Sequence, residues 1–103
     1  MLSHGRFKEV KALVGKMMPV ARRVLGENDQ ITLTMRWFEA GALYRDVGAT
    51  LDDLREAVEK LEDVARTTRR VLGGAHPIVG SIERDLQDAQ AALRAREASP
   101  GSQ

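Results

Sequence analysis

The chain contains no cysteine, and this absence excludes disulfide bonds, thiolate metal sites and cysteine nucleophiles. It has two histidines, His4 and His76, which are too few for a histidine-rich metal site. Aromatic residues make up 4% of the sequence and isoleucine is scarce, so the residues that favour β-strands are few. The residues that dominate instead are leucine, alanine, valine, glutamate and arginine, a composition typical of a soluble helical protein.

The sequence also has no long apolar run and no strong excess of one charge. Its formal net charge of +1 is too small to argue for binding to nucleic acid or to an acidic membrane surface. No apolar segment approaches the roughly 18–20 residues of a membrane-spanning helix, and the N-terminus lacks the apolar core of a signal peptide. We therefore expect a cytoplasmic protein without nucleic-acid or membrane partners. Residues 1–25 are locally basic, because they contain six Lys or Arg and a single acid, Glu9.

A five-residue segment occurs twice, 47 residues apart. Arg22-Arg23-Val24-Leu25-Gly26 returns as Arg69-Arg70-Val71-Leu72-Gly73. Cations suit the negative end of a helix dipole, and glycine readily adopts the left-handed conformation that closes a helix. Each copy therefore predicts a helix C-terminus closed by Gly26 or Gly73, and recurrence at such a period indicates a helical repeat protein.

Apolar residues at alternating spacings of three and four predict four helices, near residues 6–25, 30–47, 50–72 and 77–96. Pro19 lies inside the first of these helices and predicts a kink. Four sets of residues are expected to face inward, one set for each helix in chain order. They are Phe7, Val10, Val14, Met17, Ala21 and Val24; Leu33, Trp37, Ala40, Gly41 and Tyr44; Leu51, Leu54, Val58, Leu61, Ala65, Thr68 and Leu72; and Ile78, Ile82, Leu86, Ala89 and Leu93.

These helices predict one all-α domain, residues 5–96, built of antiparallel helical hairpins. The third helix has the clearest start, because Thr50 and Asp53 have the spacing of a capping box. Residues 1–4 and 97–103 have little to bury and are expected to be disordered.

The sequence contains no recognisable catalytic or cofactor-binding pattern. Asp52-Asp53 and Glu62-Asp63 are adjacent acids, but neighbours on a helix point in different directions, so a solvated helix face explains them better than catalysis. Ser81 and His76 are five positions apart, which is not the helical spacing for a nucleophile and its base. Gly73-Gly74 follows a helix instead of opening one after a strand, unlike a phosphate loop. We therefore expect a protein that is not an enzyme and that uses no metal or cofactor.

Residues 37–48 resemble the first helix of a tetratricopeptide repeat. That family has Trp, Leu, Gly and Tyr at fixed spacing and then a turn glycine, and here the pattern reads Trp37-x-x-Ala40-Gly41-x-x-Tyr44-x-x-x-Gly48, with Ala40 in place of leucine. The junction from Ala21 to Thr34 is similar to the kinesin light chain type of repeat, and Gly73 to Pro77 echoes it. The resemblance covers about residues 5–93 and implies an α-solenoid of about four helices.

The resemblance also implies roles for individual residues. Packing and turn roles fall on Trp37, Gly41, Tyr44, Gly48, Gly26 and Gly73, with Trp37 largely buried against the helix that carries Leu54 and Val58. Groove-facing positions, where a partner peptide or helix binds, fall on Met35, Phe38, Ala42, Arg45 and Asp46. For Phe38, packing against a neighbouring helix is an equally good interpretation. The Lys and Asn residues that clamp a peptide carboxylate in some family members have no counterpart here.

Two functional hypotheses follow. The first is a scaffold or adaptor that holds a partner peptide or helix against its groove. The second is a self-assembling fragment, because the first helix presents Val14 and Met17 without the helix that precedes it in such repeats. We expect either a piece of a longer repeat array or a homodimer that pairs through this helix. A compact four-helix bundle that buries the stripe within the chain is a further alternative.

Overall fold

A computed structural model of the chain describes residues 4–46 and 48–98, and the secondary structure of this part is entirely helical. The helices are α1 (His4–Leu25), α2 (Gln30–Arg45), α3 (Leu51–Leu72) and α4 (Pro77–Ala98). All four predicted helices are confirmed, although α2 ends before Val47, which lies outside the described residues. Helix α1 begins two residues earlier and α4 ends two residues later than predicted. Of the tails expected to be disordered, residues 1–3 and 99–103 lie outside the described residues.

The helix ends form where the sequence supplies caps. At the start of α3 the Thr50 hydroxyl accepts a hydrogen bond from the Asp53 amide at 3.1 Å, and the Thr50 amide donates to the Asp53 carboxylate at 3.0 Å. This is the predicted capping box. Gly26 and Gly73 have φ of 94° and 90°, the left-handed region that favours glycine. Each glycine donates its amide to the carbonyl of the first arginine of its repeated segment, at 3.1 Å in the first copy and 2.9 Å in the second.

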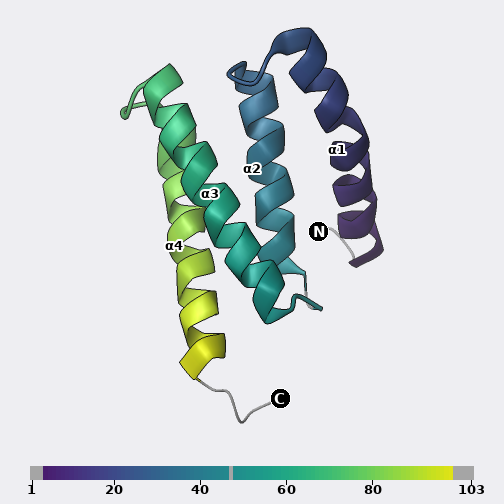
Figure 1. Cartoon of the computed structure of the whole chain (residues 1–103), viewed down its shortest axis with the longest axis vertical. Helices are drawn as coiled ribbons and strands as arrows, with labels where there is room; N and C mark the ends of the chain where they lie inside the picture. Colours follow the sequence, from purple (N-terminus) through teal and green to yellow (C-terminus); the bar gives the residue numbers. More distant parts are fainter. Residues whose placement is uncertain (1–3, 47, 99–103) are drawn as a thin grey trace.

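Each helix runs antiparallel to the next, and sequence neighbours pack as successive pairs (Figure 1). Helix α2 also touches α4, so these two lie on the same side of α3. Between α1 and α4 the described residues make no comparable contact, and Figure 1 shows α1 at the edge of the molecule. The helices therefore do not close into a four-helix bundle. None of the described helices has the length and hydropathy needed to span a membrane.

The hydrophobic core lies between α2, α3 and α4. Its buried members are Leu33, Ala40, Leu61, Val64, Ala65, Ile82 and Ala89. Trp37, Tyr44, Val58, Ile78 and Leu86 pack against this cluster and are partly buried. The predicted inward stripes of α3 and α4 therefore do face the core, where Val64 and Val79, which those stripes left out, are also fully buried. Because residues of three helices meet in one cluster, α2 covers the apolar face that α3 and α4 share.

The predicted inward face of α1 is confirmed at Ala21 but not at Met17 and Val24. Met18 is 2% exposed and Ala21 is buried, whereas Met17 is 45% and Val24 is 70% exposed. The predicted stripe was therefore wrong at Met17 and Val24, because α1 is apolar over more than one face and α2 covers the face that carries Met18. The side chains of Phe7 and Val10 lie outside the described residues. Helix α1 continues through Pro19, and Figure 1 shows its C-terminal end curving over toward α2, as the proline predicts.

Candidate functional site

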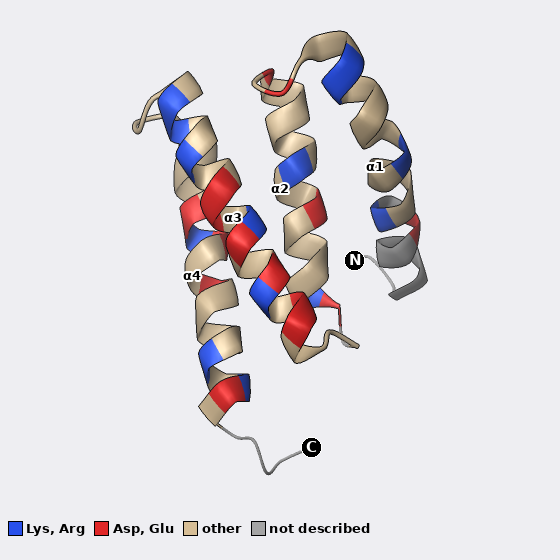
Figure 2. Ribbon diagram, in the orientation of Figure 1, with Lys and Arg blue, Asp and Glu red and all other residues tan. Residues whose placement is uncertain are grey.

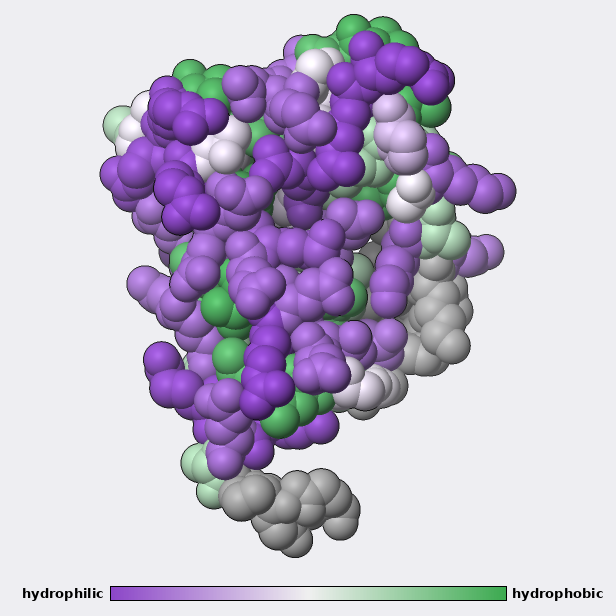
Figure 3. All heavy atoms as spheres, viewed as in Figure 1, coloured by the Kyte–Doolittle hydropathy of each residue, from purple (hydrophilic) through white to green (hydrophobic). Residues whose placement is uncertain are grey.

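Exposed apolar side chains gather on the first two helices. Among the described residues, the large apolar side chains that remain exposed lie on α1 or α2 with the exception of Val71 on α3. Those of α1 are Leu13, Met17, Val20, Val24 and Leu25, and those of α2 are Ile31 and Phe38. Figure 3 shows hydrophobic atoms at the upper right, where α1 ends and the chain turns toward α2. Apolar surface concentrated in this way marks a binding surface more often than scattered single residues do.

Apart from Leu13 and Val71, these side chains line an open groove along α1 and α2. Two adjoining hollows of about 620 Å³ and 240 Å³ share Ile31 and Met35. We call the combined depression the α1–α2 groove and define it by six residues, Val14, Met17, Val24, Ile31, Met35 and Phe38. At the mouth of the groove the ring of Phe38 lies 5.5 Å from that of Trp37 and is tilted against it. The groove therefore has one wall from each helix and an aromatic side chain at its rim.

Two of the five positions that the resemblance assigned to a partner line this groove, and three do not. Met35 and Phe38 line it. Ala42 is buried. The Arg45 guanidinium instead forms an ion pair with Asp85 of α4 at 2.9 Å. Asp46 accepts a hydrogen bond from the Gly48 amide at 2.9 Å and lines a separate, more polar hollow with Lys11 and Glu39.

Trp37, Gly41, Tyr44 and Gly48 belong to the packing of α2 and to the turn after it. Trp37 is partly buried against the core, and its Nε1 donates to the Asp85 carboxylate at 2.7 Å, so α4 as well as α3 contributes to its surroundings. A Cβ at Gly41 would lie 3.1 Å from the Arg45 guanidinium, so glycine leaves room for that side chain. Burial raises the pKa of Tyr44 above its usual value, while the Arg45 cation beside it acts in the opposite direction.

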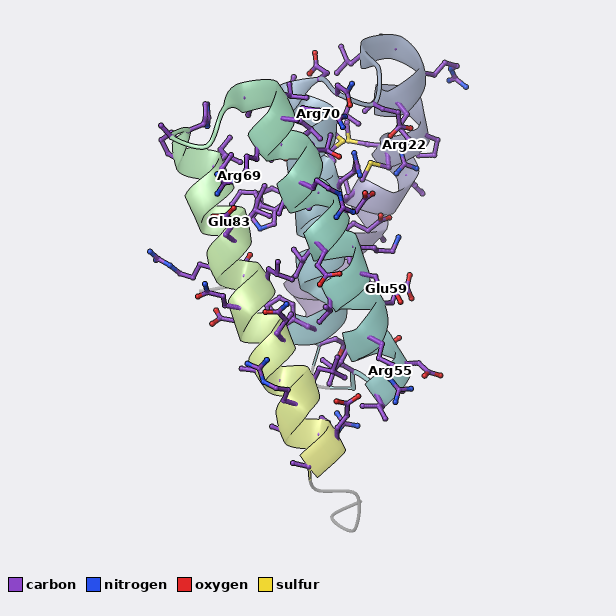
Figure 4. All side chains as sticks on the ribbon, turned by 60° about the vertical axis from the view of Figure 1, so that its left-hand side comes forward. Arg22, Arg55, Glu59, Arg69, Arg70 and Glu83 are labelled. Carbon is purple, nitrogen blue, oxygen red and sulfur yellow. The ribbon has the colours of Figure 1, made fainter. Side chains whose placement is uncertain are left out.

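Ion pairs on the outer surface tie the helices together. Arg69 of α3 contacts Glu83 of α4 at 2.6 Å, and Figure 4 shows these two side chains side by side. Arg36 of α2 contacts Asp63 of α3 at 2.9 Å, and Lys60 of α3 lies 3.8 Å from Glu39 of α2. Exposed pairs of this kind contribute little stability individually. They do show which charged side chains of neighbouring helices face each other.

The α2 side of the groove carries a signal that was visible in the sequence. Ile31, Met35, Phe38 and Ala42 follow one another at spacings of four, three and four, a second apolar stripe beside the one that faces the core. When a helix has two apolar stripes, one stripe faces the core. The other either packs against a second neighbouring helix or stays exposed as the wall of a groove. The pairing of Trp37 and Arg45 with Asp85 had no such signal, because Asp85 is 48 and 40 residues away from them in the chain.

Comparison with protein-family models, with curated proteins and with solved structures found no match. Among the described residues there is also no cluster of three or more side chains suited to hold a metal ion. The apolar groove is therefore the feature of the described structure from which a function is inferred.

Proposed function

We propose that this chain is a non-enzymatic interaction module, a scaffold or adaptor of tetratricopeptide-like helical hairpins, which binds a segment of another protein in the α1–α2 groove. The observation that carries the proposal is that Met17, Ile31 and Phe38 stay exposed in a groove, while α2 covers the apolar surface that α3 and α4 share. Covering such a surface contributes about 25 cal/mol per Å² of apolar area, which is the main driving force for protein association.

Three features support the tetratricopeptide-like character of the module. The pairs follow one another in chain order, and α2 also touches α4 on the same side of α3. Trp37 and Tyr44 pack against the shared core, and Gly41 leaves room for the Arg45 side chain. Gly26 and Gly73, 47 residues apart, follow α1 and α3 with similar positive φ angles.

Self-association through α1 is a second candidate, and one observation favours it. Leu13, Met17, Val20 and Val24 follow one another along α1 and all are exposed, so two copies of the helix could pair. Charge opposes this pairing, since the charged residues of α1 are mainly Lys and Arg (Figure 2). Two such helices brought together would place like charges side by side.

The test places a photo-crosslinking amino acid at position 38 of the full chain and, as the matched control, at Val71, an exposed apolar position on α3. We expect a protein partner from the native cell extract to be crosslinked at position 38 but not at position 71, and to be lost when Val14→Glu is added. Identical products at both positions would contradict the proposal.

A sedimentation series over concentration then separates the two candidates. The interaction module stays a monomer in the absence of its partner, whereas self-association gives a dimer that Val14→Glu dissociates.

A further inference from the structure

Residues 47 apart occupy equivalent places in the two helix pairs, well beyond the repeated motif itself. Helix α1 begins at His4 and ends at Leu25, and α3 begins and ends 47 residues later, at Leu51 and Leu72. Helices α2 and α4 begin at Gln30 and Pro77, again 47 residues apart. Each residue of the α1–α2 groove therefore has a counterpart in the α3–α4 pair, and the two can be compared directly.

Three of the six groove residues have fully buried counterparts, whereas Val24 corresponds to Val71, which is 39% exposed. Val14, Met17 and Met35 correspond to Leu61, Val64 and Ile82, all of which are fully buried. These three lie in one cluster with Leu33 and Ala40 of α2. Helix α2 thus fills the groove of the α3–α4 pair. By equivalence, the α1–α2 groove has the shape to hold an α-helix.

We infer that the α1–α2 groove takes an amphipathic α-helix of a partner protein, lying antiparallel to α1 as α2 lies antiparallel to α3. The inference rests on the proposed interaction function and specifies the partner. Such helix-in-groove binding places apolar side chains at helical spacing against both walls.

The charged residues around the two grooves differ, and the differences specify the chemistry of the partner helix. In the α3–α4 pair, Asp63 meets Arg36 of α2, and the counterpart of Asp63 is Lys16. The partner helix therefore has an acid where α2 has Arg36. Lys60 meets Glu39 of α2, and its counterpart is Leu13, which calls for an apolar residue where α2 has Glu39.

The third difference lies at the rim of the groove. Asp85 accepts the hydrogen bond of Trp37 and the ion pair of Arg45, and its counterpart is Phe38. An apolar side chain is therefore needed where α2 has Arg45. A cation held there would lose its carboxylate partner and gain none.

These differences also argue against a second copy of this chain as the occupant. The chain's own α2 would bring Arg36 against Lys16 and Glu39 against Leu13, one repulsive contact and one unpaired charge. The charged residues of α1 are mainly Lys and Arg (Figure 2), so the α1 of a second copy would bring further cations toward Lys16. An acidic amphipathic helix has the complementary charge.

The experiment titrates the full chain with two labelled synthetic peptides and follows fluorescence anisotropy. One peptide has the sequence of α2, residues 30–45, and the other, the complementary peptide, carries Arg36→Glu, Glu39→Leu and Arg45→Leu. Both are cross-linked into helices, and circular dichroism confirms their helicity. We expect the complementary peptide to bind at least about tenfold more tightly, since a single unpaired or repulsive charge is enough for such a difference.

A groove-exchange variant makes the test reciprocal. Leu13→Lys, Lys16→Asp and Phe38→Asp together give the α1–α2 groove the charges of the α3–α4 groove, and the preference between the two peptides should reverse. Lys11→Asp is the matched control, because Lys11 lies on the same helix but lines the separate polar hollow. It makes the same charge change as Lys16→Asp and should leave the preference as it is.

Three outcomes would overturn the inference. Equal binding of the two peptides would show that the charges around the groove do not select the partner. Absence of peptide binding, combined with a partner crosslinked at position 38, would refute a helical partner and leave the proposed function standing. A dimer of the chain that dissociates when the groove-exchange substitutions are made would show that a second copy is the occupant.

Discussion

The α1–α2 pair and the α3–α4 pair are built alike and yet differ in what covers them. Both first helices have 22 residues, and both end in the same five residues with a glycine at positive φ. On α3 the central residue Leu61 is fully buried, whereas its counterpart Val14 on α1 lines an open groove. Burial here is decided by the third helix that lies on a pair, because a helical hairpin alone covers one face of each of its helices.

The largest effect is expected when the Trp37 side chain, which packs α2 against the α3–α4 pair, is removed. Trp37→Ala should lower the free energy of unfolding by about 3–5 kcal/mol, since it leaves a cavity and takes the hydrogen-bond donor from Asp85. Urea unfolding monitored by circular dichroism measures the change. The control, Trp37→Phe, keeps most of the packing and should cost less. An unfolding free energy unchanged by Trp37→Ala would show that α2 does not hold the α3–α4 pair together.

The next prediction compares counterparts directly. Leu61→Ala should cost about 2–5 kcal/mol, as expected for a fully buried leucine. Val14→Ala should cost about 1 kcal/mol or less, because that position is only partly covered. Unfolding of the two variants under the same conditions gives the difference. Equal costs would mean that the groove around Val14 is filled in solution, and a concentration series would then show whether a second copy fills it.

A smaller effect is expected at a buried hydroxyl of the covered pair. The Thr68 hydroxyl is buried and has no hydrogen-bond partner among the described residues. Thr68→Val should therefore stabilise the chain by about 1 kcal/mol, because valine has nearly the same shape and no polar atom to desolvate. Thr32→Val is the control, since the Thr32 hydroxyl donates to the Ala21 carbonyl at 3.4 Å. Thr32→Val should not raise the free energy of unfolding. Equal stabilisation by both substitutions would show that the missing hydrogen bond of Thr68 is not the cause.

The smallest expected effect concerns the pKa of Tyr44, the only tyrosine in the chain. Burial raises this pKa in the folded protein above the usual value of 10.0. The folded state then holds the phenolic proton more tightly than the unfolded state does. The resulting stability is fully present below pH 10.0 and is lost as the pH rises through the folded-state pKa. Tyrosinate absorbance, titrated with and without denaturant, should show the higher pKa in the folded chain, and coinciding curves would refute it.

The sequence predicted the elements of the fold better than the surfaces between them. The stripe of α3 could be identified because its apolar residues, such as Leu54 and Leu61, are flanked by charged residues that exclude every other face. In α1 the neighbours Met17 and Met18 are both apolar, so periodicity alone could not decide which of them would face α2. The structure buries Met18.

The candidate site was predictable only in part, for the same physical reason. Phe38 and Met35 belong to a stripe that the sequence displays, and both line the groove. Arg45 was assigned to the partner by resemblance, but Asp85 of α4 holds it in an ion pair. Such pairings depend on the packing of distant helices and leave no pattern in the local sequence.

Packing in chain order has a consequence for how the molecule opens. Helix α1 is held mainly by α2, whereas α2 and α3 each have partners on two sides. In a chain of nearest-neighbour interfaces, a terminal unit can detach while the others remain folded. The amide hydrogens of α1 should therefore exchange with solvent before those of α3. A helix bound in the α1–α2 groove would contact both α1 and α2 and so oppose the detachment of α1. Amide exchange in α1 would then become slower, because α1 would open together with the other three helices.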